Sequence, residues 1–111
     1  MPGKKLVYGI LLSPLAELDL EEIWLYTFRQ WSVEQADTYH RSLISAIEGL
    51  AAGRKVWQKT NVRPGYWKYR VGRHIIFFHN NGGFLNVIRI LHESMDVEQH
   101  LDVGMAFDAE E

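Results

Sequence analysis

The sequence contains no cysteine and only three prolines in 111 residues. The absence of cysteine excludes disulfides and thiolate metal sites, and it fits a reducing compartment. The apolar run from Leu6 to Leu12 is far shorter than the roughly 20 residues of a membrane span. It also meets Ser13-Pro14 without a small-residue cleavage site, which argues against a signal peptide. We therefore expect a cytoplasmic protein with no membrane segment.

Acidic residues are missing from a long central stretch. Between Gly53 and His92 there is no Asp or Glu, whereas eight basic residues occur there: Arg54, Lys55, Lys59, Arg63, Lys68, Arg70, Arg73 and Arg89. The net charge of −2 is therefore the sum of −3 for residues 1–52, +8 for residues 53–92 and −7 for residues 93–111. The composition is globular, with 47% hydrophobic residues. We expect one domain over residues 1–101 and an acidic tail over 102–111.

The N-terminal third predicts a strand followed by a helix. Leu6 to Leu12 is apolar without alternation, which favours a strand inside a sheet with both faces at least partly covered. Ser13-Pro14 then predicts a helix start, because serine caps free amides and proline is tolerated at the first helical position. This helix is expected to reach about Trp31.

The first helix has a wide apolar surface. One stripe at helical spacing consists of Ala16, Leu20, Ile23 and Thr27, and an adjacent one consists of Trp24, Phe28 and Trp31. A helix packed only on a sheet needs one stripe. The second stripe therefore indicates either the core of a helical hairpin or a surface for a partner protein.

A second helix and three strands are predicted next. Ser32 and Gln35 have the spacing of a capping box, and the helix they open has one apolar face, consisting of Ala36, Tyr39, Leu43, Ile47 and Leu50, before it ends near Ala52-Gly53. Trp57 is expected to hold the following connector to the core. Residues 66–92 are rich in β-branched and aromatic residues and are broken by Gly72 and by Gly82-Gly83, which predicts an antiparallel meander. Residues 93–101 are expected to form a short helix or turn.

Three blocks of sequence resemble the ParE branch of the RelE/ParE toxin superfamily. The first block consists of Ser13-Pro14, Ala16, Asp19-Leu20, Ile23 and Tyr26. The second consists of Arg63-Pro64-Gly65, Tyr69, Val71-Gly72, His74, Ile76 and Phe78. The third consists of Arg89-Ile90-Leu91-His92, Met95-Asp96 and His100-Leu101. The resemblance covers roughly residues 6–101 and retains the spacing in each block.

This resemblance implies an α+β fold of order β-α-α-β-β-β, an antiparallel-rich sheet packed against a helical hairpin. It also implies the toxin of a type II toxin–antitoxin pair, which would act on DNA gyrase by protein–protein contact without a cofactor. The partner would be a ParD-like antitoxin whose C-terminal segment wraps the toxin. No covalent catalysis, no metal and no sequence-specific nucleic-acid binding are expected.

The other branch of the superfamily consists of ribosome-dependent mRNA endonucleases, and it is the alternative. Such cleavage needs cations and proton-transfer groups, which Arg70, Arg73, Arg89, His74 or His92 could supply. However, no tyrosine follows Tyr69, whereas the nuclease branch commonly uses a C-terminal tyrosine or a paired acid–base group. A plain nucleic-acid binder is a further alternative, because basic sheets with aromatics can contact phosphates and stack bases.

Two surfaces follow from these patterns. Arg89 lies between Ile88 and Ile90, and Arg70 lies between Tyr69 and Val71, so both are expected to project onto one uncovered sheet face. We predict target contact by Arg70, Arg73, His74, Arg89 and His92. We predict antitoxin contact by Leu20, Trp24, Phe28, Trp31 and Trp67. His74 and His92 are expected to flank a hairpin and to hydrogen-bond across strands.

Overall fold

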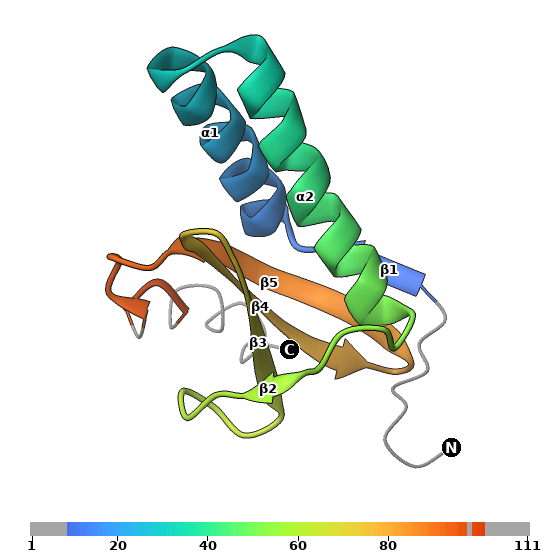
Figure 1. Cartoon of the computed structure of the whole chain (residues 1–111). Helices are drawn as coiled ribbons and strands as arrows, with labels where there is room; N and C mark the ends of the chain where they lie inside the picture. Colours follow the sequence, from blue (N-terminus) through green and yellow to red (C-terminus); the bar gives the residue numbers. More distant parts are fainter. Residues whose placement is uncertain (1–8, 98, 102–111) are drawn as a thin grey trace.

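The computed structural model describes residues 9–97 and 99–101 of the chain. Its elements are β1 (Gly9–Leu12), α1 (Pro14–Gln30), α2 (Val33–Ala51), β2 (Gln58–Lys59), β3 (Tyr66–Val71), β4 (His74–Asn81) and β5 (Phe84–His92). The predicted α+β fold is confirmed, with the short strand β2 in addition to the expected elements. Figure 1 shows α1 and α2 side by side, both on one side of the sheet. The acidic tail, and the part of the first predicted strand before Gly9, lie outside the described residues.

Both helices begin where the sequence predicts. The Ser13 side chain accepts a hydrogen bond from the Ala16 amide at 3.0 Å, and Ser32 does the same for Gln35 at 3.1 Å. These caps satisfy amides that have no partner inside the helix, which stabilises each helix start by about 1 kcal/mol. The helices therefore follow each other with only a short turn between them and form the predicted hairpin.

The strands pair in the order β1-β5-β4-β3-β2. β1 runs parallel to β5, whereas the pairs β5–β4, β4–β3 and β3–β2 are antiparallel. The expectation that the first strand lies inside the sheet is wrong, because β1 is an edge strand whose Ile10 and Leu11 are exposed. Within Gly9–Leu12 no residue is fully buried, so the lack of alternation does not reflect burial on both faces.

The main core lies between the sheet and the helices. It includes Leu20, Leu43, Ile47, Ile76 and Phe78, all with less than a tenth of their surface exposed. Trp57 belongs to it, and its indole N–H donates to the Leu50 carbonyl at 3.1 Å, so the expected role in holding the connector is confirmed.

The opposite sheet face carries a second, smaller core. Tyr66, Phe77, Ile88 and Leu91 meet the fully buried Leu101 there, with Val62, Ile75 and Val97 at the margin. The segment after β5 includes Val97 and the helical residues 99–101, so it covers this face as well as forming the expected turn. The face that the sequence suggested was uncovered is therefore partly covered.

A pairing irregularity on β5 changes which residues share a face. Phe77 pairs with Arg89 while Phe78 pairs with Val87, so Ile88 is an extra residue between the two pairs. As a result Ile88 joins the second core and Ile90 the main core. The expectation that Arg89 projects opposite to both of them was wrong, because it assumed strict alternation.

None of the helices in the described part of the chain is both long and apolar enough to cross a membrane.

Candidate functional site

The end of the β3–β4 hairpin lies against the helices and the end of β5. His74 at the start of β4 pairs with His92 at the end of β5, and the two imidazoles are edge to face with centroids 5.2 Å apart. The hairpin turn passes through Gly72, whose φ is +57°. A Cβ at this position would lie 2.8 Å from the Tyr39 hydroxyl, so only glycine allows the turn to approach α2 this closely.

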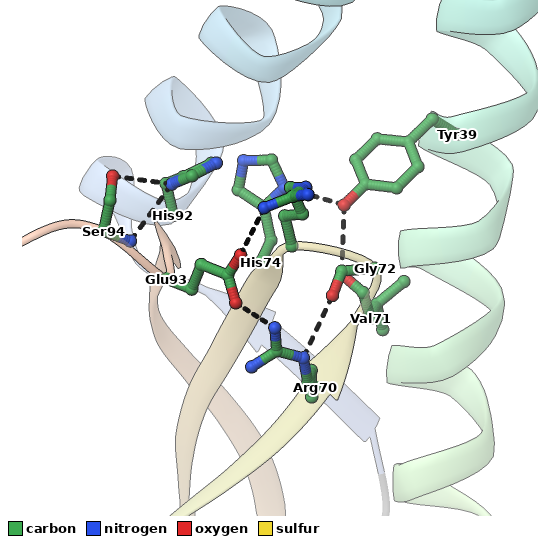
Figure 2. A network of polar contacts seen from close by, with 9 residues as sticks. Tyr39, Arg70, Val71, Gly72, His74, His92, Glu93 and Ser94 are labelled. Carbon is green, nitrogen blue, oxygen red and sulfur yellow. Dashed lines mark hydrogen bonds and ion pairs between the residues drawn. The ribbon is translucent and has the colours of Figure 1, made fainter.

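Tyr39 fastens this turn to α2. Its hydroxyl donates to the Val71 carbonyl at 3.0 Å and lies 2.7 Å from Nδ1 of His74 (Figure 2). Because a phenol has one proton, donation to Val71 leaves its oxygen to accept from an Nδ1–H of His74. Burial raises the pKa of Tyr39, so the hydroxyl keeps its proton at neutral pH. The prediction that the two histidines hydrogen-bond across strands is wrong for the partners seen here, because His74 meets Tyr39 on α2 and His92 Nδ1 lies 2.8 Å from the Ser94 hydroxyl oxygen.

His74 is uncharged at neutral pH. Burial lowers its pKa to about 4, and the neighbouring His92 acts in the same direction, whereas Asp19 and Glu93 oppose the shift. The cause is physical: an imidazolium here would lose much of its hydration. His74 therefore acts as a neutral hydrogen-bonding group in the native state.

Glu93 gathers the two arginines of the hairpin, as Figure 2 shows for Arg70. One carboxylate oxygen binds Arg70, and the other lies 2.8 Å from Arg73 Nη1. Arg70 also donates from Nε to the Gly72 carbonyl at 3.1 Å. Their guanidinium groups hold the pKa of Glu93 below its ordinary value. Two guanidinium groups and one carboxylate leave a net positive charge. The side chains of Arg70 and Arg73 stay 55% and 77% exposed, so this charge lies on the surface, held in place by Glu93.

Arg89 has a different environment. Its guanidinium meets the Asp19 carboxylate through two hydrogen bonds, of 2.8 and 2.9 Å, and both side chains are only 12% exposed. Asp19 also accepts the Ile90 amide at 2.9 Å, so it continues the edge pairing of β5 beyond the end of β1. The hydrogen bonds to Asp19 raise the pKa of Arg89 further. The pairing register places Arg70 and Arg89 on one sheet face as expected, but Arg89 is bound by Asp19 of α1 and by the His100 carbonyl rather than left in the open.

A cleft of about 390 Å³ lies between α1 and these strand ends. Ile23 and Tyr26 line it from α1, and His74 and His92 line it from the sheet. Of the five predicted target residues, these two histidines thus face the cleft, Arg70 and Arg73 lie on the adjoining hairpin, and Arg89 is an internal ion pair. Within the described part of the chain, no three His, Asp or Glu side chains are grouped so as to hold a metal ion.

Three residues of this region were missed as functional candidates. Tyr39 was assigned only to the apolar face of α2, and Asp19 was quoted only as part of the family resemblance. Glu93 is the first acidic residue after the basic stretch, and that position was the one available signal that it meets arginines. Their partners are 20 to 70 residues away along the chain, so sequence spacing could not reveal them.

The predicted antitoxin residues do not form one surface. Trp24 and Phe28 stack on α1 with centroids 5.4 Å apart, and Trp31 at the end of this helix is 70% exposed. By contrast, Leu20 is buried in the main core, and Trp67 packs on Trp57 in the sheet region. Trp24, Phe28 and Trp31 therefore stay predicted contacts on an open surface, whereas the prediction for Leu20 and Trp67 involves largely covered side chains.

Comparison with known proteins agrees with this architecture. Residues 10–97 match the family described as the ParE toxin of the type II toxin–antitoxin system, parDE. The chain is 43% identical over 93 residues to Toxin ParE1 of Mycobacterium tuberculosis, covering 82% of this chain and 95% of that protein. It is 40% identical over 91 residues to Toxin ParE1 of Caulobacter vibrioides, covering 81% and 94%.

A solved structure described as the chromosomal ParDE TA system from P. aeruginosa shares the fold. The TM-score is 0.66 at 15% identity, and the match covers 79% of this chain and 96% of that chain. The strand order, the helical hairpin and the sequence match over residues 10–97 lead to one conclusion: this chain belongs to the ParE toxin family of type II toxin–antitoxin systems.

Proposed function

We propose that this ParE-type toxin inhibits DNA gyrase by protein–protein contact and is neutralised by a ParD-like antitoxin. In this proposal the protein is cytoplasmic, residues 1–101 form one toxin domain, and no covalent step or cofactor is involved. The observation that carries it is the state of the charged groups at the hairpin end. The exposed Arg70 and Arg73 suit contact with a partner protein. The largely buried Arg89 and the uncharged His74 do not suit phosphate cleavage.

The target surface consists of Arg70 and Arg73 on the β3–β4 hairpin. Glu93 holds both guanidinium groups, which reduces the side-chain freedom that binding would otherwise have to remove. Each guanidinium presents several N–H donors, and most of their surface is open, so carboxylates of a protein partner can bind there. His92, at the adjoining cleft, completes the surface.

The ribonuclease alternative fits these groups less well. Phosphate cleavage needs free cations near the developing charge and a group that exchanges protons near neutral pH. Of the three arginines, Arg89 is held in a largely buried ion pair with Asp19, so it is not free to meet a phosphate. The pKa of His74 is about 4, so this imidazole is not a proton donor at neutral pH.

The exposed aromatic residues of α1 support an antitoxin surface. Phe28 and Trp31 are 42% and 70% exposed although each could contribute roughly 1.5 to 3 kcal/mol if buried. Together with Trp24 they form a row at spacings of four and three residues along one helix. Such a row is typical of a face that a partner protein covers.

The test is supercoiling by purified gyrase with and without the protein, scored for lost supercoiling and for accumulated cleaved DNA. We expect inhibition by the native chain and at least a tenfold weaker effect for Arg70→Ala with Arg73→Ala, because two charged contacts are lost together. The matched control is Arg29→Ala with Arg41→Ala, which removes two exposed helix arginines. Arg89 is left unchanged because it holds Asp19.

A ribosome-programmed mRNA cleavage assay is run beside it. Unaffected gyrase together with cut mRNA would overturn the proposal in favour of the nuclease alternative. Equal inhibition by the native chain and the Arg70/Arg73 double variant would remove the hairpin surface from the mechanism while keeping gyrase as the target.

A further inference from the structure

A groove between α1 and α2 has no part in the proposed target surface. Leu20, Trp24 and Leu25 line it from α1, and Ile44 lines it from α2. Its volume is about 750 Å³. Residues spaced by three, four and seven positions lie on one helix face, so the groove runs along the helix pair rather than across it. This is the shape that receives another helix.

The apolar floor continues past the groove. Phe28 stacks on Trp24, and Trp31 follows one turn later at the end of α1. Both have large exposed surfaces, so the apolar row extends from the groove to the tip of the helical hairpin. A partner helix of several turns would be needed to cover it.

The rim of the groove is acidic. Glu17 and Glu21 border it from α1, and Asp37 borders it from α2, where it accepts the Trp24 indole N–H at 2.9 Å. Neither Glu17 nor Glu21 forms an ion pair within the described part of the chain. Being four residues apart on one helix, they repel each other. No Lys or Arg among the described residues lines this groove, so a cationic partner would relieve the repulsion between Glu17 and Glu21.

We propose that this groove binds an amphipathic helical segment whose apolar side chains recur every three or four residues and are flanked by Lys or Arg. The proposal rests on the proposed function, because it assigns this segment to the antitoxin. Apolar contacts with the groove floor supply the affinity, and the flanking cations meet Glu17 and Glu21. An acidic antitoxin segment, which the basic stretch alone would suggest, does not suit this groove. The partner therefore needs a basic amphipathic segment here.

Two synthetic peptides of equal length test the charge requirement. They share one apolar face of Leu, Ile and Trp and carry either Lys/Arg or Glu at the flanking positions. Binding to the full chain is measured by fluorescence anisotropy at low and high salt. We expect the basic peptide to bind at least tenfold more tightly, and salt to reduce this preference because exposed charges are screened.

Charge reversal in the groove sharpens the test. Glu17→Lys with Glu21→Lys is expected to lower the affinity for the basic peptide at least tenfold and to raise the affinity for the acidic peptide. The matched control is Glu34→Lys with Glu48→Lys, which makes the same charge change on α2 and also alters one first-turn glutamate, but outside the groove lining. The control is expected to change both affinities less than threefold.

Three outcomes would overturn the proposal. They are no binding of either peptide, equal binding of both, and an equal response to the groove and control variants. Self-association of the chain that disappears in the Glu17/Glu21 variant would assign the groove to a second copy instead. These readouts do not involve gyrase, so a failure of gyrase inhibition leaves them unchanged and is recognised separately.

Discussion

The hairpin end and the outer face of α1 differ in whether their side chains have partners within the chain. At the hairpin end, Arg70 and Arg73 meet Glu93, and Tyr39 meets Val71 and His74. On α1, Glu17 and Glu21 have no ion pair among the described residues, and Trp31 extends into solvent. The first region is completed by contacts within the chain. The second leaves these groups open to a partner.

This difference separates stability from binding. Contacts within the chain contribute to the free energy of unfolding, and their loss is felt before any partner arrives. Exposed groups contribute little to folding and become important when a partner buries them. Substitutions at the hairpin end should therefore lower the free energy of unfolding, whereas substitutions on the outer face of α1 should lower the affinity for a partner.

Gly72→Ala is expected to have the largest effect on the free energy of unfolding, a loss of about 2–3 kcal/mol, because it combines a positive φ with a clash against Tyr39. Gly82→Ala is the matched control: its φ is +62° but its Cβ would meet nothing within 4 Å, so about 1 kcal/mol is expected. Urea unfolding measures both. Equal losses would mean that the approach of Tyr39 does not restrict this turn.

The pH dependence of stability is expected to depend on His74. Its native pKa of about 4 lies below the ordinary 6.5, so the unfolded chain binds more protons between these values and stability falls as pH drops through this window. Because the imidazole is only half-buried, we expect a loss of about 1–2 kcal/mol between neutral pH and pH 4. Arg70 and Arg73 hold the pKa of Glu93 below its ordinary value, so the stability that this ion pair contributes is also lost as pH falls through that lowered pKa.

The measurement is urea unfolding across this pH range for the native chain and for His74→Gln. The variant should lose the corresponding part of the slope, whereas His79→Gln, at another half-buried histidine, should keep it. An unchanged slope in His74→Gln would assign the pH dependence to other groups.

Trp31→Ala is expected to have the smallest effect on stability, within about 0.5 kcal/mol, because the side chain is 70% exposed. It should nevertheless lower the affinity for the basic amphipathic peptide by roughly tenfold, as expected for an aromatic contact at an interface. Val56→Ala, at a 78% exposed position outside the groove lining, serves as the control for both measurements. A large loss of stability without a change in peptide affinity would reverse the comparison between the two regions.

Local signals predicted most elements of the fold. Ser13-Pro14 and Ser32 began helices because their side chains cap free amides whatever lies nearby. Gly72 and Gly82-Gly83 ended strands because they supply positive φ. The two-residue strand β2 was missed, since Gln58 and Lys59 acquire their conformation by pairing with β3. The edge position of β1 was missed for the same kind of reason, because strand order is not written in a strand's own composition.

The candidate site was less accessible from sequence. Arg70 and Arg73 were identified by the charge of the basic stretch, but their common partner Glu93 was not. Arg89 was assigned to an open surface, and the register does place it on the sheet face of Arg70, but Asp19 and the His100 carbonyl bind it there. The family resemblance supplied the expectation of a toxin, and the match over residues 10–97 confirms that part.

The sequence by itself determined the helices, the meander, the absence of disulfides and the segregation of charge, because each of these depends on neighbouring residues or on composition. Only the tertiary structure decided which charges remain available. It paired Arg89 with Asp19 across 70 positions, gathered Arg70 and Arg73 around Glu93, and left Glu17 and Glu21 beside an apolar groove. The physical reason is that an ion pair depends on distance and burial in space, which a linear order of residues does not specify.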